Sequence, residues 1–169
     1  MHATDRTAAI TMPCAALLCA ALTACGARGR VAPSAAETSA ARTAVTALAD
    51  SILAAAGARD ADRFAAHFAP GEGLVYLLNT TRRLSSQAAL RDAFRRMLDR
   101  QREFAPRWTD RHVQVLSPGA AVFTGAFRTS ARDTSGAAWG AEGVVTFVAR
   151  RDPTGWRVVN WHTSETPAP

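Results

Sequence analysis

Several motifs that would assign a chemistry are missing from this sequence of 169 residues. It contains no glycine-rich phosphate loop, no histidine cluster with the spacing of metal ligands and no nucleophile elbow. Phosphate-loop binding, histidine metal centres and hydrolysis by an elbow serine are therefore not indicated. We predict that the protein uses no cofactor and holds no metal.

Lysine is also absent, so arginine supplies all 20 basic residues and the net charge of +6. Such an excess could attract nucleic acid. Nucleic-acid-binding proteins, however, gather basic residues on one stripe with aromatic stacking partners. Here acids alternate with arginines, as at Arg91-Asp92 and Asp110-Arg111. We therefore expect no nucleic-acid partner.

Cysteine is scarce as well: the chain has three, and Cys14 and Cys19 lie within an apolar run at residues 8–24. The length of that run suits the core of a signal peptide and is short for a membrane-spanning helix, which needs about 20 apolar residues. Removal of the signal would leave Cys25 as a single cysteine, which has no partner for an intrachain disulfide. A cysteine zinc site is then excluded.

The apolar run ends at Leu22-Thr23-Ala24-Cys25, which resembles the bacterial lipobox. The resemblance implies that residues 1–24 are a lipoprotein signal peptide and that acylated Cys25 anchors the mature protein to membrane lipid. Acylation would occupy the thiol and exclude a thiol enzyme. A plain secretory signal or an apolar N-terminal helix is the alternative.

The small and polar residues 25–36, which include Pro33, are typical of a flexible tether. Together with the lipobox resemblance, they place the protein outside the cytoplasm. We expect it to be exported and lipid-anchored to the cell envelope, at the outer membrane, on its periplasmic side or at the cell surface.

The folded part is predicted to begin with helices. Apolar residues recur at spacings of three and four from Ala41 to Ala55, which predicts a helix that ends at Gly57. Asp60 and Ser86 are suitable N-caps for two further helices. Residues 74–78 have the composition of a strand.

After Pro106 the pattern changes to four runs rich in valine, phenylalanine, tryptophan and threonine. Turn signals separate these runs, which suggests an antiparallel meander. Helices first and strands last predict one α+β domain at residues 37–166, with the helices on one face of the sheet. The four predicted strands are residues 108–116, 121–130, 137–150 and 156–164.

Three segments of this domain resemble SnoaL-like domains, which have the nuclear transport factor 2-like, or cystatin-like, cone fold. Residues 58–70 are similar to the second helix of that family, residues 86–100 to its third helix, and residues 150–164 to its last hairpin. The resemblance implies N-terminal helices packed on a curved antiparallel sheet around a cavity. Because such folds host isomerases, dehydratases, hydrolases and scaffolds, the resemblance does not specify an activity.

The last hairpin narrows the resemblance to one subgroup. It ends in a tryptophan, a hydrophobic strand and His162-Thr163-Ser164, similar to the calcium/calmodulin-dependent protein kinase II association domain. Where that domain has arginines in its pocket, this chain has Phe127, Thr146 and Thr163. A preference for anionic ligands is therefore not carried over.

An apolar cavity with a few polar groups is the default binding site. Strict alternation along the last strand would put Val158, His162 and Ser164 on one face and Trp161 and Thr163 on the other. The sequence does not say which face lines the cavity. Candidate pocket residues are therefore drawn from both faces and from the neighbouring strands: Tyr76, Phe127, Trp139, Trp161 and His162.

No catalytic residue is assigned, although three side chains could move protons. His162 could act as a general base, or it could be a buried histidine that bonds to the backbone or to Ser164. Glu142 would have a raised pKa in an apolar cavity, but an exposed position on the outer face is the interpretation we favour. Asp110 is interpreted in the same way, as a residue of a solvated rim.

Three hypotheses for function follow. We favour a membrane-anchored lipoprotein whose SnoaL-like domain binds a small apolar or mixed ligand, and we expect no catalysis. The first alternative is an isomerase, dehydratase or hydrolase that uses His162 with a carboxylate. The second is a structural module that forms a homodimer through the open sheet face, with Trp161 as an anchor.

Overall fold

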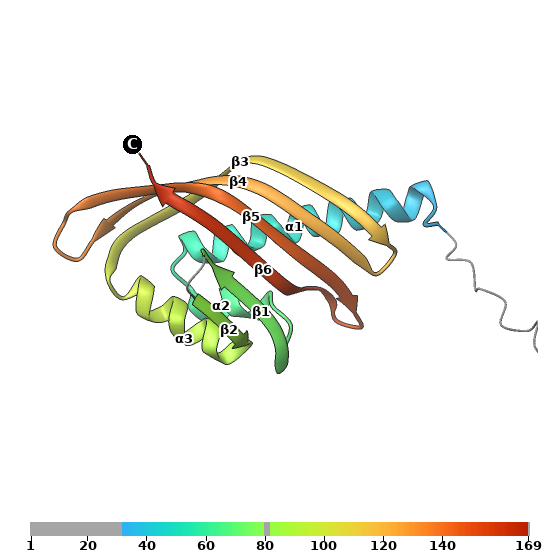
Figure 1. Cartoon of the computed structure of the whole chain (residues 1–169), viewed down its shortest axis with the longest axis horizontal. Helices are drawn as coiled ribbons and strands as arrows, with labels where there is room; N and C mark the ends of the chain where they lie inside the picture. Colours follow the sequence, from blue (N-terminus) through green and yellow to red (C-terminus); the bar gives the residue numbers. More distant parts are fainter. Residues whose placement is uncertain (1–31, 80–81, 169) are drawn as a thin grey trace, which may run out of the picture. The chain divides into compact units, whose positions relative to one another are not determined.

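Figure 1 shows the computed structural model, which describes residues 32–79 and 82–168. The predicted signal peptide, Cys25 and residues 25–31 of the predicted tether lie outside the described residues. One compact unit spans Ala32–Pro169. Its elements are α1 (Ala35–Gly57), α2 (Ala61–Ala66), β1 (Glu72–Leu78), β2 (Arg82–Ser86), α3 (Gln87–Leu98), β3 (Gln101–Ser117), β4 (Ala120–Asp133), β5 (Ala138–Asp152) and β6 (Gly155–Pro167).

Side-chain caps fix where the three helices begin. The Asp60 carboxylate accepts a hydrogen bond from the Arg63 amide at 2.8 Å, and the Ser86 hydroxyl accepts one from the amide of Ala89 at 3.2 Å. These bonds satisfy amide groups that a helix leaves unpaired at its start. The N-caps predicted at positions 60 and 86 are therefore confirmed.

The first helix begins at Ala35, two residues before residue 37, where the folded domain was predicted to begin. Ser34 and Glu37 form a capping box, in which each side chain accepts a bond from the backbone amide of the other residue. The bonds from Ser34 lower the pKa of the Glu37 carboxyl. Ala35 and Ala36, which were assigned to the tether, are consequently helical.

The six strands form one curved sheet in the order β2-β1-β6-β5-β4-β3. Strands β3 to β6 are the predicted antiparallel meander. Strand β1 extends the sheet at the β6 edge of this meander, where it pairs in parallel with β6. Strand β2 was not predicted, because this short edge strand is mostly polar in sequence; its Leu84 packs against the core.

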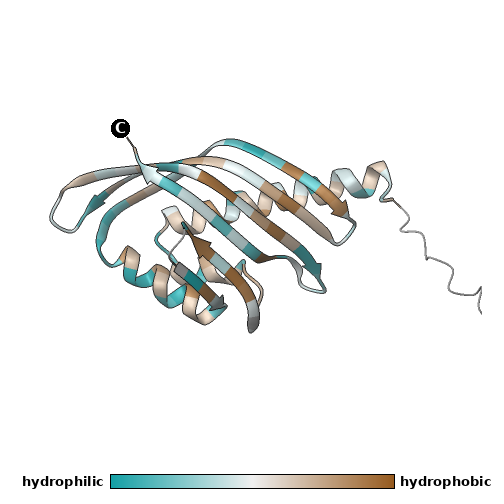
Figure 2. Cartoon of the chain, in the orientation of Figure 1, coloured by the Kyte–Doolittle hydropathy of each residue, from teal (hydrophilic) through white to brown (hydrophobic). Residues whose placement is uncertain are grey.

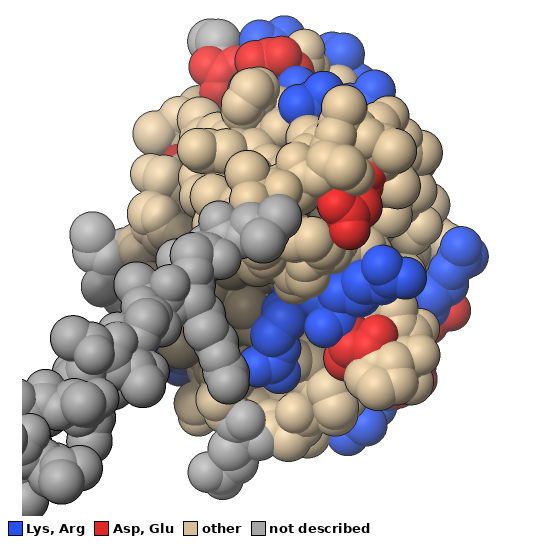
Figure 3. All heavy atoms as spheres, turned by 90° about the vertical axis from the view of Figure 1, so that its right-hand side faces the viewer, with Lys and Arg blue, Asp and Glu red and all other residues tan. Residues whose placement is uncertain are grey.

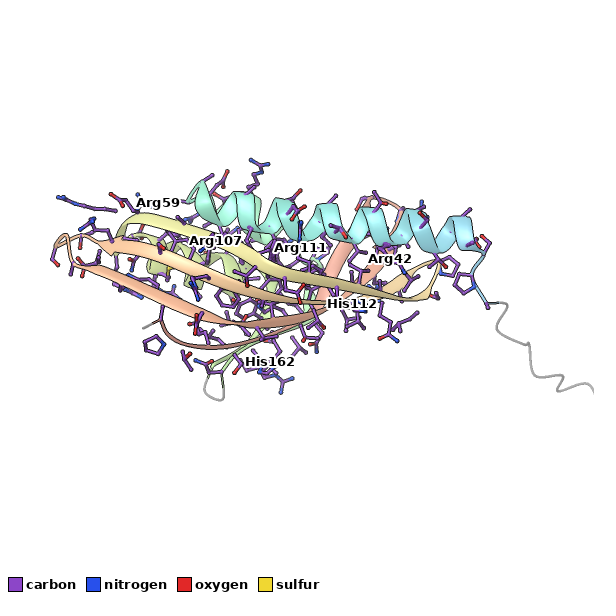
Figure 4. The ribbon with its side chains drawn as sticks, turned by 90° about the horizontal axis from the view of Figure 1, so that it is seen from above. Arg42, Arg59, Arg107, Arg111, His112 and His162 are labelled. Atoms are coloured by element: carbon purple, nitrogen blue, oxygen red, sulfur yellow. The ribbon has the colours of Figure 1, made fainter. Side chains whose placement is uncertain are left out.

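The helices lie on one side of this sheet, and α1 runs along β3 (Figure 4). Figure 2 shows hydrophobic and hydrophilic residues alternating along the strands of the meander, as expected for a sheet with one covered face. The predicted α+β cone fold is therefore confirmed. In the described part of the chain, no helix is long and apolar enough to span a membrane.

Charged side chains are mixed on the surface. On the face in Figure 3, arginines lie beside acidic residues instead of forming one uninterrupted patch. Arg95 of α3, for example, pairs with Asp62 of α2 at 2.9 Å. Both side chains are about half exposed or more, and such surface pairs contribute only about 0–1 kcal/mol each. Stability must therefore come mainly from the core.

The core is organised around four aromatic rings that cross four neighbouring strands. Phe123 of β4 is paired with Phe147 of β5, which is paired with Trp161 of β6, which is paired with Tyr76 of β1. Successive ring centroids are 4.6, 5.4 and 5.9 Å apart, and the ring planes are within 11° of parallel. We call this set the aromatic ladder; stacked cross-strand pairs of this kind stabilise a sheet beyond their burial.

A β-bulge in β6 determines which side chains face the ladder. Ala149 of β5 is paired with Val158, but the preceding Val148 is paired with Asn160, so that Val159 is an extra residue. The extra residue reverses the alternation, and Val158 and Trp161 are both buried on the inner face. The strict alternation predicted from sequence, which put these two residues on opposite faces, is therefore wrong.

Replacing Phe147 by alanine tests the ladder. Phe147 is fully buried between Phe123 and Trp161, so we expect Phe147→Ala to lower the free energy of unfolding by about 3–5 kcal/mol in urea denaturation. Leu116→Ala is the control, because Leu116 is 53% exposed and its loss should cost about 0.5 kcal/mol or less. A loss below about 1 kcal/mol for Phe147→Ala would show that the ladder does not support the fold.

Candidate functional site

A cavity of about 190 Å³ lies between the inner face of the sheet and the three helices. All six strands and all three helices contribute side chains to its wall, most of which are apolar. Among the described residues, four polar side chains other than indoles line it: Tyr76, Thr129, Thr163 and Glu165.

Three tryptophans line the cavity, and each one directs its indole N–H to an acceptor within the protein. Trp108 donates to the carbonyl of Ala49 at 3.4 Å, and Trp139 donates to the side chain of Gln101 at 2.7 Å. Trp161 donates to the Thr163 hydroxyl. The indoles therefore present apolar rings to the cavity while their hydrogen-bond donors are already used.

Glu165 is the charged residue that lines the cavity within the described part of the chain. It lies on β6 beyond the bulge, on the same face as Trp161 and Thr163. Its backbone amide donates to the side chain of Asn79 at 2.9 Å, which fixes this part of β6 against the end of β1. Among the arginines whose side chains are described, none pairs with its carboxylate, and burial raises the pKa of Glu165.

Gly143 allows the backbone of β5 to approach the backbone of β6 closely at Glu165. The two residues are paired across β5 and β6. A Cβ atom at position 143 would lie 2.2 Å from the carbonyl oxygen of Ser164 and 2.8 Å from the Cα of Glu165. Because backbone atoms cannot yield to such a contact, a glycine is required at this position.

The structure places four of the five predicted pocket residues in the cavity wall: Tyr76, Phe127, Trp139 and Trp161. The fifth, His162, lies outside it. His162 is exposed on the opposite face of the sheet, away from α1 (Figure 4), because the bulge at Val159 directs it outward. The same bulge buries Trp161, so this residue cannot anchor a dimer through the outer face.

Glu142 and Asp110, the carboxylates predicted as partners of His162, do not lie next to it in the structure. Glu142 lies on the outer face and pairs with Arg128 at 2.8 Å. It is four residues along β5 from Thr146, the cross-strand partner of His162, which corresponds to roughly 13 Å. Asp110 is exposed on β3, three strands away from β6. The structure therefore assembles no acid–base pair from these three residues.

Glu165 was missed because the last strand was predicted to end at Ser164, whereas β6 continues to Pro167. Counting onward in steps of two from Trp161 would have reached Thr163 and then Glu165 on the same face. Within the described residues, no group of three or more histidine, cysteine, aspartate or glutamate side chains could hold a metal ion.

The raised pKa of Glu165 predicts a pH-dependent effect of Glu165→Gln. The folded protein holds the Glu165 proton more tightly than the unfolded chain does, so wild-type stability falls as the pH rises through the raised pKa. Glu165→Gln should therefore be more stable than wild type at pH 7–8 and equal to it below about pH 4. Thermal denaturation across this range measures the difference.

Glu142→Gln is the matched control, because Glu142 is on the outer face and is paired with Arg128. That variant should show no gain in stability that grows with pH. A gain for Glu165→Gln that is the same at all pH values, or that is largest in acid, would contradict the burial of the Glu165 carboxyl.

Comparison with known proteins agrees with this architecture. The family model of the SnoaL-like domain matches residues 45–169, which is most of the chain. No curated protein matches the chain.

Solved structures with the same fold include proteins with different names. A nuclear transport factor 2-like protein from Salmonella enterica serovar Typhimurium superposes with a TM-score of 0.71 at 18% identity, over 78% of this chain and 94% of that one. A proposed calcium/calmodulin-dependent protein kinase II association domain from Xanthomonas campestris gives 0.64 at 24% identity, over 74% and 87%. The hexachlorocyclohexane dehydrochlorinase LinA-type3 from Novosphingobium barchaimii gives 0.69 at 15% identity, over 80% and 94%. At these identities the likenesses establish the fold alone.

Proposed function

The chain belongs to the family of SnoaL-like domains, and on that basis we propose that its cavity binds a small molecule with an apolar, ring-sized body. The observation that carries the proposal is the cavity of about 190 Å³, which has an apolar wall and a few polar groups. An apolar cavity of about 150 Å³ is large enough to hold benzene. A ligand with one aromatic or alicyclic ring therefore suits the volume.

The wall supports this choice of ligand. Phe104, Phe127 and Val145 offer carbon surface, and the indole donors of the three tryptophans are used within the protein. Binding would gain about 25 cal/mol for each Å² of apolar surface removed from water. The dehydrochlorinase with the same fold is named for hexachlorocyclohexane, a compound with one apolar ring.

Catalysis in this cavity would use a different proton-transferring residue from those predicted. His162, Glu142 and Asp110 lie outside the cavity wall, so a proton transfer to a bound ligand would fall to Glu165. A carboxyl group with a raised pKa is suited to that task. Binding is nevertheless the function that we propose, since it requires no group beyond the wall itself.

We also propose that the domain is exported and anchored through acylated Cys25. The lipobox-like Leu22-Thr23-Ala24-Cys25 supports this proposal. From Cys25 to the first residue of α1, Ala35, the chain can extend at most about 35 Å. The cavity would therefore be held close to a membrane surface, where apolar compounds concentrate.

Filling the cavity tests the proposed binding. Ala141 is a buried wall residue of β5, so Ala141→Leu should occupy part of the cavity. We expect at least one compound of a panel of toluene, phenol, indole and benzyl alcohol to raise the melting temperature of the wild type. A ligand at a hundredfold excess over its Kd should add about 2.7 kcal/mol.

The same compound should have little effect on Ala141→Leu. Ala138→Leu is the matched control, because it adds the same side chain at an exposed position of the same strand and should leave the shift unchanged. The proposal fails if no compound stabilises the wild type, or if both variants respond as the wild type does.

Mass spectrometry of protein extracted from membranes tests the anchor. The intact mass should correspond to a chain that begins at Cys25 and carries a diacylglycerol group, and Cys25→Ser should no longer fractionate with membranes. A free thiol at position 25, or a chain that retains residues 1–24, would contradict the anchor.

A further inference from the structure

We propose that the cavity selects an organic cation, namely a protonated amine or a quaternary ammonium group attached to an apolar ring, with Glu165 as the counter-ion. This inference rests on the proposed function, because it names the chemical class of the ligand in the same cavity. It is carried by the juxtaposition, in one cavity wall, of aromatic rings and a carboxylate that forms no ion pair with any described side chain.

The described wall of the cavity carries a negative charge. The chain has a net charge of +6, yet among the described wall residues the one charged group is the carboxylate of Glu165. None of the arginines whose side chains the structure describes forms an ion pair with it, whereas Glu142 on the outer face pairs with Arg128. A cation that entered the cavity would supply a counter-charge that none of the described side chains provides. An anion would be repelled.

Several hydrogen-bonding groups of the wall are already used within the protein. An ionised Glu165 only accepts hydrogen bonds, and the hydroxyl of the nearby Thr163 already accepts one from Trp161. The other indole donors of the wall, on Trp108 and Trp139, are bonded to protein acceptors. The hydroxyl groups of the wall can donate or accept, so the carboxylate of Glu165 is the wall group that can only accept. An ammonium group, which supplies up to three donors, is matched to it.

Aromatic side chains form part of the cavity wall. Phe104 and Trp139, whose ring centroids are 6.4 Å apart, line the same cavity as Glu165, and so does Tyr76. The faces of aromatic rings attract cations, and the attraction is greater where water is excluded. Aromatic walls with one carboxylate therefore favour a cation over a neutral molecule of the same shape.

Isothermal titration calorimetry of the purified protein at pH 7.5 tests the inference with three probes of one shape. Benzylammonium is the cation, benzyl alcohol is the neutral analogue and benzoate is the anion. We expect benzylammonium to bind at least about tenfold more tightly than benzyl alcohol, and benzoate to show no binding. This comparison within the wild type does not depend on any variant.

Two variants locate the effect. Glu165→Gln should bind benzylammonium and benzyl alcohol equally, whereas Glu142→Gln should keep the wild-type preference. Ala141→Leu should abolish the binding of benzylammonium, which separates binding in the cavity from pairing with surface carboxylates.

Equal affinity of the wild type for benzylammonium and benzyl alcohol would overturn the cation inference and leave the proposed function standing. Tighter binding of benzoate would also overturn it. If none of the three probes binds, both the inference and the proposed function fail for ligands of this size.

Discussion

The aromatic ladder holds the sheet and the helices of this protein together. Phe123, Phe147, Trp161 and Tyr76 stack across four adjacent strands, and the stack is what holds β1 in register beside β6 on the inner face. Phe68 packs against both Trp161 and Tyr76, so the segment after α2 is fastened to the same rings. The ladder thus joins the sheet to its helical layer, and two of its rings, Tyr76 and Trp161, line the cavity.

The bulge at Val159 connects this core to the candidate site. Because it adds one residue, it allows Val158 to pack in the core while Trp161, Thr163 and Glu165 face the cavity. A regular strand would exchange these residues for Asn160, His162 and Ser164. The chemistry of the cavity, a carboxylate among aromatic rings in place of a histidine, is therefore decided by a single backbone irregularity.

The sequence predicted the features that depend on local chemistry. Asp60 and Ser86 cap helices because their side chains reach amides three residues away, and the turns of the meander follow from their glycine, proline and aspartate residues. The bulge could not be predicted, because it depends on the pairing of β6 with β5, which is set by contacts distant in sequence. Strand β2 was not predicted for a similar reason: it is short and mostly polar, and it forms a strand only by pairing with β1.

Thiol accessibility along β6 shows which face of this strand lines the cavity. Single cysteines at positions 162, 163 and 164, each in a background in which Cys14, Cys19 and Cys25 are replaced by serine, would be labelled with a maleimide under native conditions. The account predicts rapid labelling at 162 and 164 and much slower labelling at 163, since His162 and Ser164 are exposed and Thr163 is buried. Rapid labelling at 163 with protection at 162 would show that the opposite face of β6 lines the cavity.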